Sequence, residues 1–346
     1  MISIKEVAAM APTSARPRKV TLADVARYTG VSTAVVSYVI NDGPRPVAAE
    51  TALRVREAID VLGYRPNTSA RALMTGSTGI VGLIHPGTSN PFFGEYGDAF
   101  YKVATEAGVA LLTATSAGRA DTERALIESL ASRNVDGIIS VTSMTKADIS
   151  GIRNPRIPLL FVNCPFPIPG YQTIGPNAID GSLRVVDHLL AHHGHRQVAL
   201  VAGGTRSEEP EERQLGWLEA HRRLGLAAGP VVRTSYTADG GYDAIGSLLD
   251  PPERPSAVFV TSDLQAFGAL HAIHDRGLRI PDDIAVVSFD GTEASAHTWP
   301  PLTVAQQPLH SMAAAGVAGV MSDAAPTHTL IDMNLVLRRS CGCEPP

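Results

Sequence analysis

Several of the residues best able to bind a small molecule in this 346-residue chain follow its apolar segments. An arginine fork and an aspartate acceptor placed across a cleft can bind vicinal hydroxyls, while an aromatic ring covers the apolar face of the same ligand. Arg213 precedes a helical pattern, Asp263 follows the segment VFVTS, and Asp290 follows VVSF. We therefore expect one ligand site, whose contacts are His85, Asn90, Phe92, Phe93, Asn163, Arg213, Asp263, Asp290 and Gln307.

The elements that must position these side chains can be read from residues 79–346, where short apolar segments alternate with amphipathic ones. This rhythm predicts parallel sheets joined by crossover helices, and such sheets bind ligands outside the carboxyl ends of their strands. The predicted strands are GIVGLI, GVALLTA, VDGIIS, IPLLFV, QVALVAG, SAVFVTS and DIAVVSF. The predicted helices include 121–133, 180–191, 211–224 and 264–275.

Residues 20–64 have a different character, because three helical patterns follow one another there. Thr21 and Asp24 are spaced for a capping arrangement, Gly30 ends the first helix, and a second helix runs from Ser32 to about Ile40. A third runs over 49–62. Two short helices across a glycine turn are typical of a helix-turn-helix, whose second helix reads the major groove of DNA. A small helical bundle without a DNA role is the alternative.

The charges and the cysteine content agree with a DNA-binding module joined to a larger body. Residues 1–79 hold ten Lys and Arg against six Asp and Glu, a net charge of +4, so the remainder carries −9 of the total of −5. Residues 1–19 are expected to form a flexible arm. No apolar segment is long enough for a signal peptide or a membrane span, and three cysteines suit a reduced cytoplasm, so we expect a cytoplasmic protein without a membrane partner.

The chain resembles the lactose/galactose repressor (LacI/GalR) family over nearly its whole length, from Val20 to about Ser340. Each matching motif is weak alone, but their order along the chain makes the resemblance specific. The motifs are TLADVARYTGVS, VSYVIN, YRPNTSARAL, SNPFF, VDGII, HHGHRQVALVAG, ERQLGW, TSDLQAFGALHAI, RGLRIPDDIAVVSFD and PPLTVAQQP.

The resemblance implies an all-α helix-turn-helix domain followed by an α/β effector domain similar to periplasmic binding proteins, with two doubly wound parallel-sheet subdomains. The expected segments are the arm at 1–19, the DNA-binding domain at 20–64, a hinge helix and linker at 65–78, and a ligand-binding and dimerisation domain at 79–346. The expected subdomains are about 79–175 with 308–325, and 176–307 with 326–346.

The family's hinge is a short helix that docks in the minor groove as a dimer, where a leucine wedges between base steps. Leu73 matches that leucine. Tyr38 stands at a base-contacting position that often holds Arg or His in relatives, and tyrosine cannot make the two-point contact of arginine with guanine. The expected DNA contacts are Thr21, Ser32, Thr33, Ala34, Ser37, Tyr38, Asn41, Asn67, Ala70, Arg71 and Leu73.

The expected function is a homodimeric repressor that leaves a palindromic operator when a sugar-like effector binds, since Arg213 and Asp290 match sugar-contacting positions of the family. Regulation by a co-repressor, a nucleobase or a phosphorylated metabolite, is the first alternative. A plain solute-binding protein is the second, and the helix-turn-helix speaks against it.

We predict neither enzymatic activity nor a cofactor, because the phosphate-binding, nucleophile and metalloprotease motifs are missing from the sequence. We also predict no metal site. His192, His193 and His195 surround Gly194, which is typical of a helix end, and no acidic or cysteine cluster accompanies them. The tail Cys341-Gly342-Cys343 could chelate or oxidise, but it resembles a common tail sequence of the family and is expected to be inert.

Overall fold

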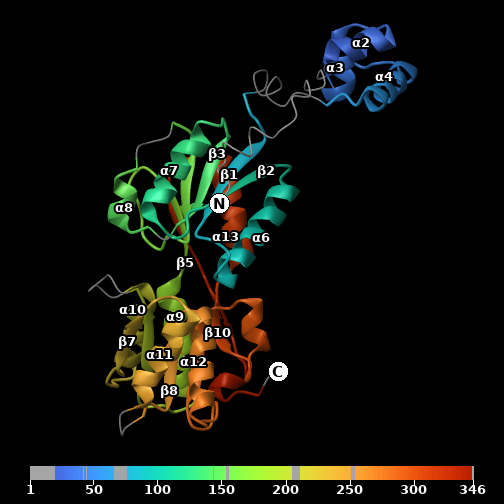
Figure 1. The fold of residues 1–346 in the computed structure, drawn as a ribbon. Coiled ribbons are helices and arrows are strands. Elements are labelled where there is room, and N and C mark those ends of the chain that lie inside the picture. The colour runs from blue at the N-terminus through green and yellow to red at the C-terminus, as the bar shows by residue number, and fades with distance from the viewer. Residues whose placement is uncertain are drawn as a thin grey trace, which may run out of the picture. The chain divides into compact units, whose positions relative to one another are not determined.

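The computed structural model of the chain divides into two compact units, residues 1–78 and 79–346 (Figure 1). The residues that it describes are 20–41, 43, 45–65, 76–142, 144–152, 156–204, 211–250 and 254–344. Among these residues, no helix combines the length and the apolar character that crossing a bilayer requires.

The described part of the first unit consists of helices packed around a small apolar core. The helices are α2 (Leu22–Thr29), α3 (Thr33–Asn41) and α4 (Ala49–Leu62). The core residues are Val25, Ala26, Val36, Val55, Ala58 and Tyr64. The three helices predicted for this segment are therefore confirmed.

Local capping explains where these helices begin and end. The Thr21 hydroxyl accepts from the Asp24 amide at 3.3 Å, and the Asp24 carboxylate accepts from the Thr21 amide at 3.0 Å, so the predicted capping box is present. The Ser32 hydroxyl accepts from the Val35 amide at 3.3 Å at the start of α3. Gly30 and Gly63 follow α2 and α4 in the left-handed conformation, with φ of 71° and 63°, which glycine adopts without steric cost.

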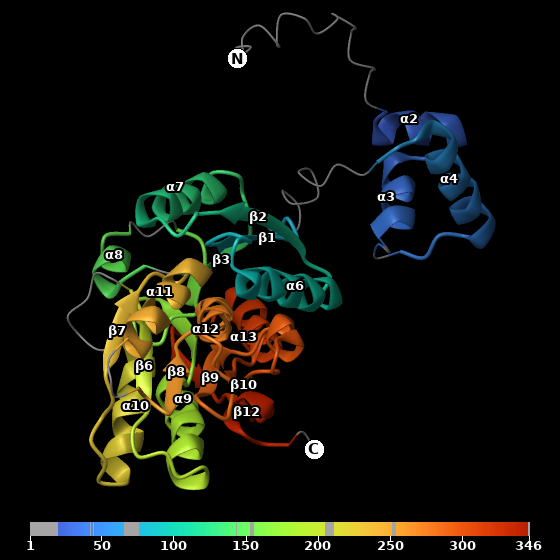
Figure 2. The ribbon, with the colours of Figure 1, turned by 60° about the horizontal axis from the view of Figure 1, so that its bottom comes forward.

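The second unit contains two sheets, each covered by helices on both faces (Figures 1 and 2). The first sheet has the strand order β11-β5-β4-β3-β1-β2, and every neighbouring pair in it is parallel. Its strands are β1 (Ile80–His85), β2 (Ala110–Thr115), β3 (Gly137–Val141), β4 (Leu159–Val162), β5 (Gln172–Pro176) and β11 (His328–Ile331).

Alternation along these strands supplies one apolar core to each face of the first sheet. Val81 and Leu83 of β1 pack with α6 (Pro91–Glu106) and α13 (Leu309–Val320). Ile84 of the same strand points to the opposite face and packs with α7 (Ala120–Ala131) and α8 (Lys146–Ser150). This period of two is the expected consequence of a pleated strand buried on both faces.

The second sheet has the order β12-β10-β9-β8-β6-β7, with only β12 antiparallel among its described pairs. Its strands are β6 (Ala199–Gly203), β7 (Val231–Thr234), β8 (Ala257–Val260), β9 (Ala285–Asp290), β10 (Thr303–Gln306) and β12 (Asn334–Val336). One face packs against α9 (Ala178–Asp187) and α10 (Glu212–Arg223), and the other against α11 (Ala238–Leu249) and α12 (Asp263–Asp275).

The chain passes three times between the two subdomains: from β5 into α9, from β10 into α13, and from β11 into β12. The boundary expected at 325 and 326 is therefore wrong in detail. β11 pairs with β5, so residues 328–331 complete the first sheet, and the last crossing comes after them. The sequence HTLI is a short edge strand with alternating exposure, which gives no apolar segment by which to recognise it.

Candidate functional site

The first turn of α3 presents small side chains to solvent. Ser32, Thr33 and Ala34 are exposed, whereas Ser37 is half-buried. Asn41 is exposed at the other end of α3, and its Nδ2 donates to the Ser37 carbonyl at 3.1 Å. Small exposed side chains at the start of the second helix are what close approach to base edges requires.

Two further residues expected to contact DNA also have roles within the unit. Thr21 is exposed but already takes part in the capping box of α2. Tyr38 is half-buried, and its ring packs so closely on Gly43 that a Cβ at that glycine would lie 2.5 Å from the ring. The other expected contacts, Asn67, Ala70, Arg71 and Leu73, lie in the hinge, outside the described residues.

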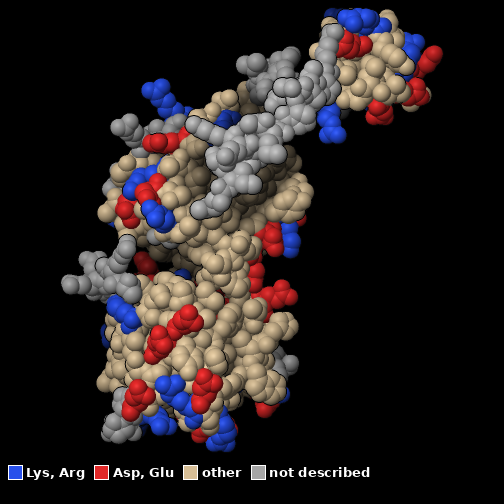
Figure 3. All heavy atoms as spheres, viewed as in Figure 1, with Lys and Arg blue, Asp and Glu red and all other residues tan. Residues whose placement is uncertain are grey.

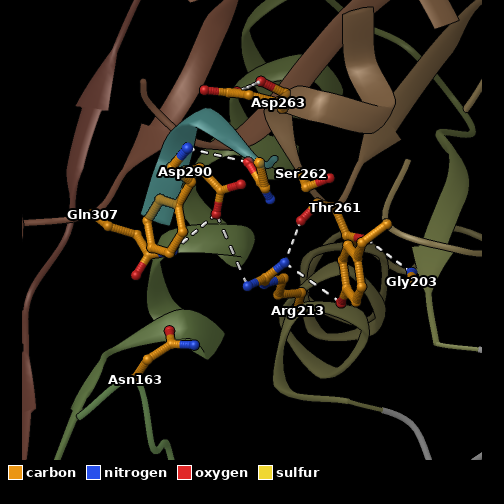
Figure 4. Close-up of polar contacts among 12 residues, drawn as sticks. Asn163, Gly203, Arg213, Thr261, Ser262, Asp263, Asp290 and Gln307 are labelled. Atoms are coloured by element: carbon orange, nitrogen blue, oxygen red, sulfur yellow. Dashed lines mark hydrogen bonds and ion pairs between the residues drawn. The ribbon is translucent and has the colours of Figure 1, made fainter. Parts of the chain in front are cut away.

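The second unit places the Arg213 guanidinium beyond the carboxyl ends of β8 and β9 (Figure 4). It lies 4.2 Å above the centre of the Phe289 ring and 4.0 Å from the Asp290 carboxylate. It also donates to the Thr261 carbonyl and, at 3.5 Å, to the Tyr236 hydroxyl. The guanidinium is thus held in one orientation by groups from three strand ends.

Asp290 is buried and held in an unusual backbone conformation. Its φ is 105°, a region that non-glycine residues rarely occupy and that is found mostly where surrounding contacts impose it. Its carboxylate accepts from Gln307 Nε2 at 2.9 Å, and its carbonyl accepts from the Gln307 amide at 2.9 Å. Burial raises the pKa of Asp290, although the charge of Arg213 opposes the shift.

The Asp263 carboxylate is also buried, but its oxygens serve the protein. They accept from the Thr292 amide at 2.7 Å, from the Thr292 hydroxyl at 2.8 Å and from the Ser288 hydroxyl. These bonds fix the loop that follows Asp290, the last residue of β9. The arrangement makes Asp263 a support for the position of Asp290, and direct contact with a ligand stays a prediction.

The residues expected from the first subdomain are neutral, and several also stabilise the fold. Asn90 caps α6 by accepting from the Phe92 amide at 3.1 Å. Phe92 is buried against Tyr96, with ring centres 5.6 Å apart, and Phe93 lies half-buried at the edge of Phe92. The Nδ2 group of Asn163 donates to the Thr142 carbonyl at 3.4 Å.

The two subdomains come together around these groups. The Glu293 amide donates to the Glu95 carboxylate at 2.8 Å, which joins the loop after β9 to α6. Asn163 faces the space beside Gln307, Asp290 and Arg213 (Figure 4), and the surface is hollowed between the subdomains (Figure 3). Gln307 Oε1 and His85 Nδ1 are buried and find no hydrogen-bond partner among the described residues, which favours a ligand that would supply one.

Sequence reasoning missed Tyr236 and Glu211, which complete the surroundings of Arg213. The Tyr236 hydroxyl donates to Glu211 at 2.7 Å. The Tyr236 ring packs directly on Gly203, where a Cβ would lie 1.9 Å from a ring carbon. Tyr236 follows β7, a strand of four half-buried or exposed residues with a charged member, so nothing in its composition marked a strand end.

Comparisons with known proteins match both units. Residues 21–67 match the model of bacterial regulatory proteins of the lacI family, and residues 186–341 match that of the periplasmic binding protein-like domain. Catabolite control protein A of Priestia megaterium is 33% identical over 303 residues, which cover 85% of this chain and 90% of that protein. The repressor PurR of Pasteurella multocida is 30% identical over 92% of this chain and 98% of its own.

Solved structures of transcription regulators are also similar to this chain. The lac repressor dimer bound to operator and the anti-inducer ONPF has a TM-score of 0.83 and 27% identity, covering 94% of this chain and 99% of that one. The complex of the regulator CelR with cellobiose has a TM-score of 0.68 and 27% identity, covering 93% of this chain and 100% of that one. The resemblance predicted from the sequence motifs is confirmed. The chain belongs to the lacI family of bacterial regulatory proteins and is a DNA-binding regulator of transcription.

Proposed function

We propose that this regulator is a homodimeric repressor that leaves a palindromic operator when a small carbohydrate binds between its subdomains. The observation that carries the proposal is the group formed by Arg213, Asp290 and Phe289 at the carboxyl edge of the second sheet. A fork of donors, a buried acceptor and an aromatic ring are the parts that binding of a polyhydroxylated ligand uses. The lac repressor structure with ONPG and the CelR structure with cellobiose support a ligand of this class.

The geometry leaves room for a hydroxyl between the charged groups. At 4.0 Å, Arg213 and Asp290 attract each other without a direct hydrogen bond, so each keeps capacity for a ligand. A sugar hydroxyl that donates to Asp290 and accepts from Arg213 would satisfy both buried charges. Such charge-assisted bonds are worth about 1.5–3 kcal/mol each.

The switch that we propose follows from the three crossings of the chain between the subdomains. A ligand held by Arg213 on one side and near Asn163 on the other favours one relative arrangement of the subdomains. In a dimer, that arrangement sets the separation of the two hinge segments. An inducer must bind the state that does not bind DNA more tightly than the DNA-binding state, by a coupling free energy of about 1–3 kcal/mol or more.

Dimeric operator binding is proposed because one helix-turn-helix makes too few base contacts for specificity in a genome, and two symmetric units read two half-sites. The hinge prediction provides a separate test. Leu73→Ala should reduce operator bending and weaken specific binding more than non-specific binding. An unchanged bend angle and operator affinity would remove the wedge role from Leu73.

The proposal is tested with the full chain and an operator selected from random DNA. Operator affinity is measured by fluorescence anisotropy with and without mono- and disaccharides, nucleobases and phosphorylated sugars. We expect a palindromic selected site and an unphosphorylated sugar that weakens binding by about fivefold or more. A nucleobase or phosphorylated compound that tightens binding would establish the co-repressor alternative instead.

A further inference from the structure

Two histidines and two cysteines that the proposed function does not use come together in the second subdomain. His188 and His193 begin and follow the π-helical turn that comes after α9, and Cys341 and Cys343 lie near the C-terminus. The two Nε2 atoms are 3.1 Å apart. Cys343 Sγ lies 3.3 Å and 3.5 Å from the Nε2 atoms of His188 and His193, and Cys341 Sγ lies 3.6 Å from that of His188. All four potential ligand atoms lie within 4.8 Å of one another.

Four of these six separations are close to the edges of a metal-centred tetrahedron, and the two that join Cys341 Sγ to His193 Nε2 and to Cys343 Sγ are within 4.8 Å. Zinc bonds of about 2.0–2.1 Å to nitrogen and about 2.3 Å to sulfur give edges of about 3.4 Å between nitrogens and about 3.6 Å between nitrogen and sulfur. The observed nitrogen–nitrogen separation of 3.1 Å and nitrogen–sulfur separations of 3.3, 3.5 and 3.6 Å lie within a few tenths of an ångström of those values.

The histidines meet because the helix changes its winding between them. Side chains five residues apart in an α-helix diverge by about 140°. After α9, residues His188–His192 instead form a π-helical turn, and the His193 amide donates to the His188 carbonyl at 3.3 Å. The wider turn places the two rings on the same side, with their centres 4.8 Å apart. Single π-turns occur frequently at functional sites.

The cysteines meet the histidines because the tail is anchored and then turned back. The Ser340 hydroxyl accepts from the Thr303 amide at 2.8 Å and donates to the Val286 carbonyl at 2.6 Å. Gly342 has a φ of 104°, and a Cβ at this position would lie 3.3 Å from the His193 ring. The Thr303 hydroxyl lies 3.0 Å from Cys341 Sγ and 2.9 Å from the Arg338 carbonyl, so it is placed to donate to a thiolate the outer hydrogen bond that stabilises a ligating sulfur.

We propose that His188, His193, Cys341 and Cys343 bind a structural Zn²⁺ ion. Two thiolates and two imidazoles in a tetrahedron are the ligand set that favours zinc, and four protein ligands leave no open position for chemistry. The ion would join the helix that follows the first crossing to the tail that follows the third. It lies away from the effector group, because Thr303 begins β10 whereas Gln307 follows its other end. This proposal departs from the expectation of no metal site, which rested on the histidines having no cysteine cluster beside them, because the fold brings Cys341 and Cys343 to His188 and His193.

The test is metal analysis of the full chain purified without a metal-affinity step. We expect about one zinc per chain. After chelation, Co²⁺ should restore binding with the visible bands of a tetrahedral site and the near-ultraviolet bands of thiolate ligation. Chelation should lower the thermal midpoint of the second unit by several degrees, and Zn²⁺ should restore it, because metal that binds only the folded state stabilises it.

Variants locate the site. Cys343→Ser and His193→Gln should each bind zinc at least tenfold more weakly while keeping operator affinity, and Cys343→Ser should also weaken the Co²⁺ thiolate bands. His192→Gln, an exposed histidine on the same turn, is the matched control and should bind like the parent. Absence of bound metal together with no Co²⁺ spectrum in the parent would overturn the proposal, as would a Cys341–Cys343 disulfide in protein purified under reducing conditions. Zinc binding by Cys343→Ser and His193→Gln as tight as that of the parent would also overturn the proposal.

Discussion

The two sides of the cleft differ in what they offer a ligand. The second subdomain contributes the buried pair of Arg213 and Asp290. Gln307 donates a hydrogen bond to the Asp290 carboxylate, and the backbone of Asp290 is held at a φ of 105°. The first contributes neutral side chains such as Asn90 and Phe92, whose polar or apolar groups already stabilise α6. Most of the binding free energy should therefore come from the second subdomain, and the first should mainly favour the subdomain arrangement of the ligand-bound state.

The largest effect expected from this difference is that of Arg213→Ala. It removes the donor fork and leaves Asp290 buried without its counter-charge, so effector affinity should fall by about 100-fold or more. Isothermal titration with the identified effector measures the loss. Arg223→Ala, a more exposed position at the other end of α10, is the control. Affinities within twofold of the parent for both variants would contradict the assignment.

Asp290→Ala should come next. Because Asp290 lies in the second unit, operator binding without effector should match that of the parent, while the response to effector should fall by about tenfold or be lost. In cells, such a variant would repress permanently. Operator titrations with and without effector provide the measurement. A parent-like response would remove Asp290 from the ligand contacts.

A smaller effect concerns pH. Burial raises the pKa of Asp290, so the folded chain keeps this proton to higher pH than the unfolded chain does. This carboxyl therefore makes the free energy of unfolding fall as pH rises from the acid range towards neutrality. Asp290→Asn should remove about 1 kcal/mol or more of that decrease. Urea unfolding at a series of pH values, followed by the fluorescence of buried Trp217, measures the free energy of unfolding. If this free energy changed with pH in the same way in parent and variant, Asp290 would not be a buried acid with a raised pKa.

The smallest effect should come from the first subdomain. Asn163 has a φ of 59°, so Asn163→Gly removes the side chain without straining the backbone. Loss of one neutral hydrogen bond should weaken effector binding by about 3–10-fold. Asn134→Gly, at an exposed position with a φ of 56°, is the matched control. A loss as large as that of Arg213→Ala would show that both sides contribute equally.

Much of the fold was predictable because its signals are local. The capping box at Thr21, the glycine at 63 and the apolar strand at 80–85 depend on neighbours in sequence, and all are confirmed. The predicted strands are all present, but the short β7 and β12 and the mixed β5, β10 and β11 were missed. Their sequences carry polar, glycine or proline residues, and their pairing with distant strands decides their structure.

The sequence by itself determined the kind of protein, because the spacing of the helix-turn-helix and the order of the motifs can be read along the chain without knowing any tertiary contact. Only the tertiary structure decided which distant residues share a site. It brought Tyr236 to Arg213 and to the neighbouring Glu211, placed β11 in the first sheet, and brought His188 beside Cys343, 155 positions away. The packing of helices onto sheets decides which distant residues meet. The π-turn at 188–192 and the anchored tail together place two histidines beside two cysteines.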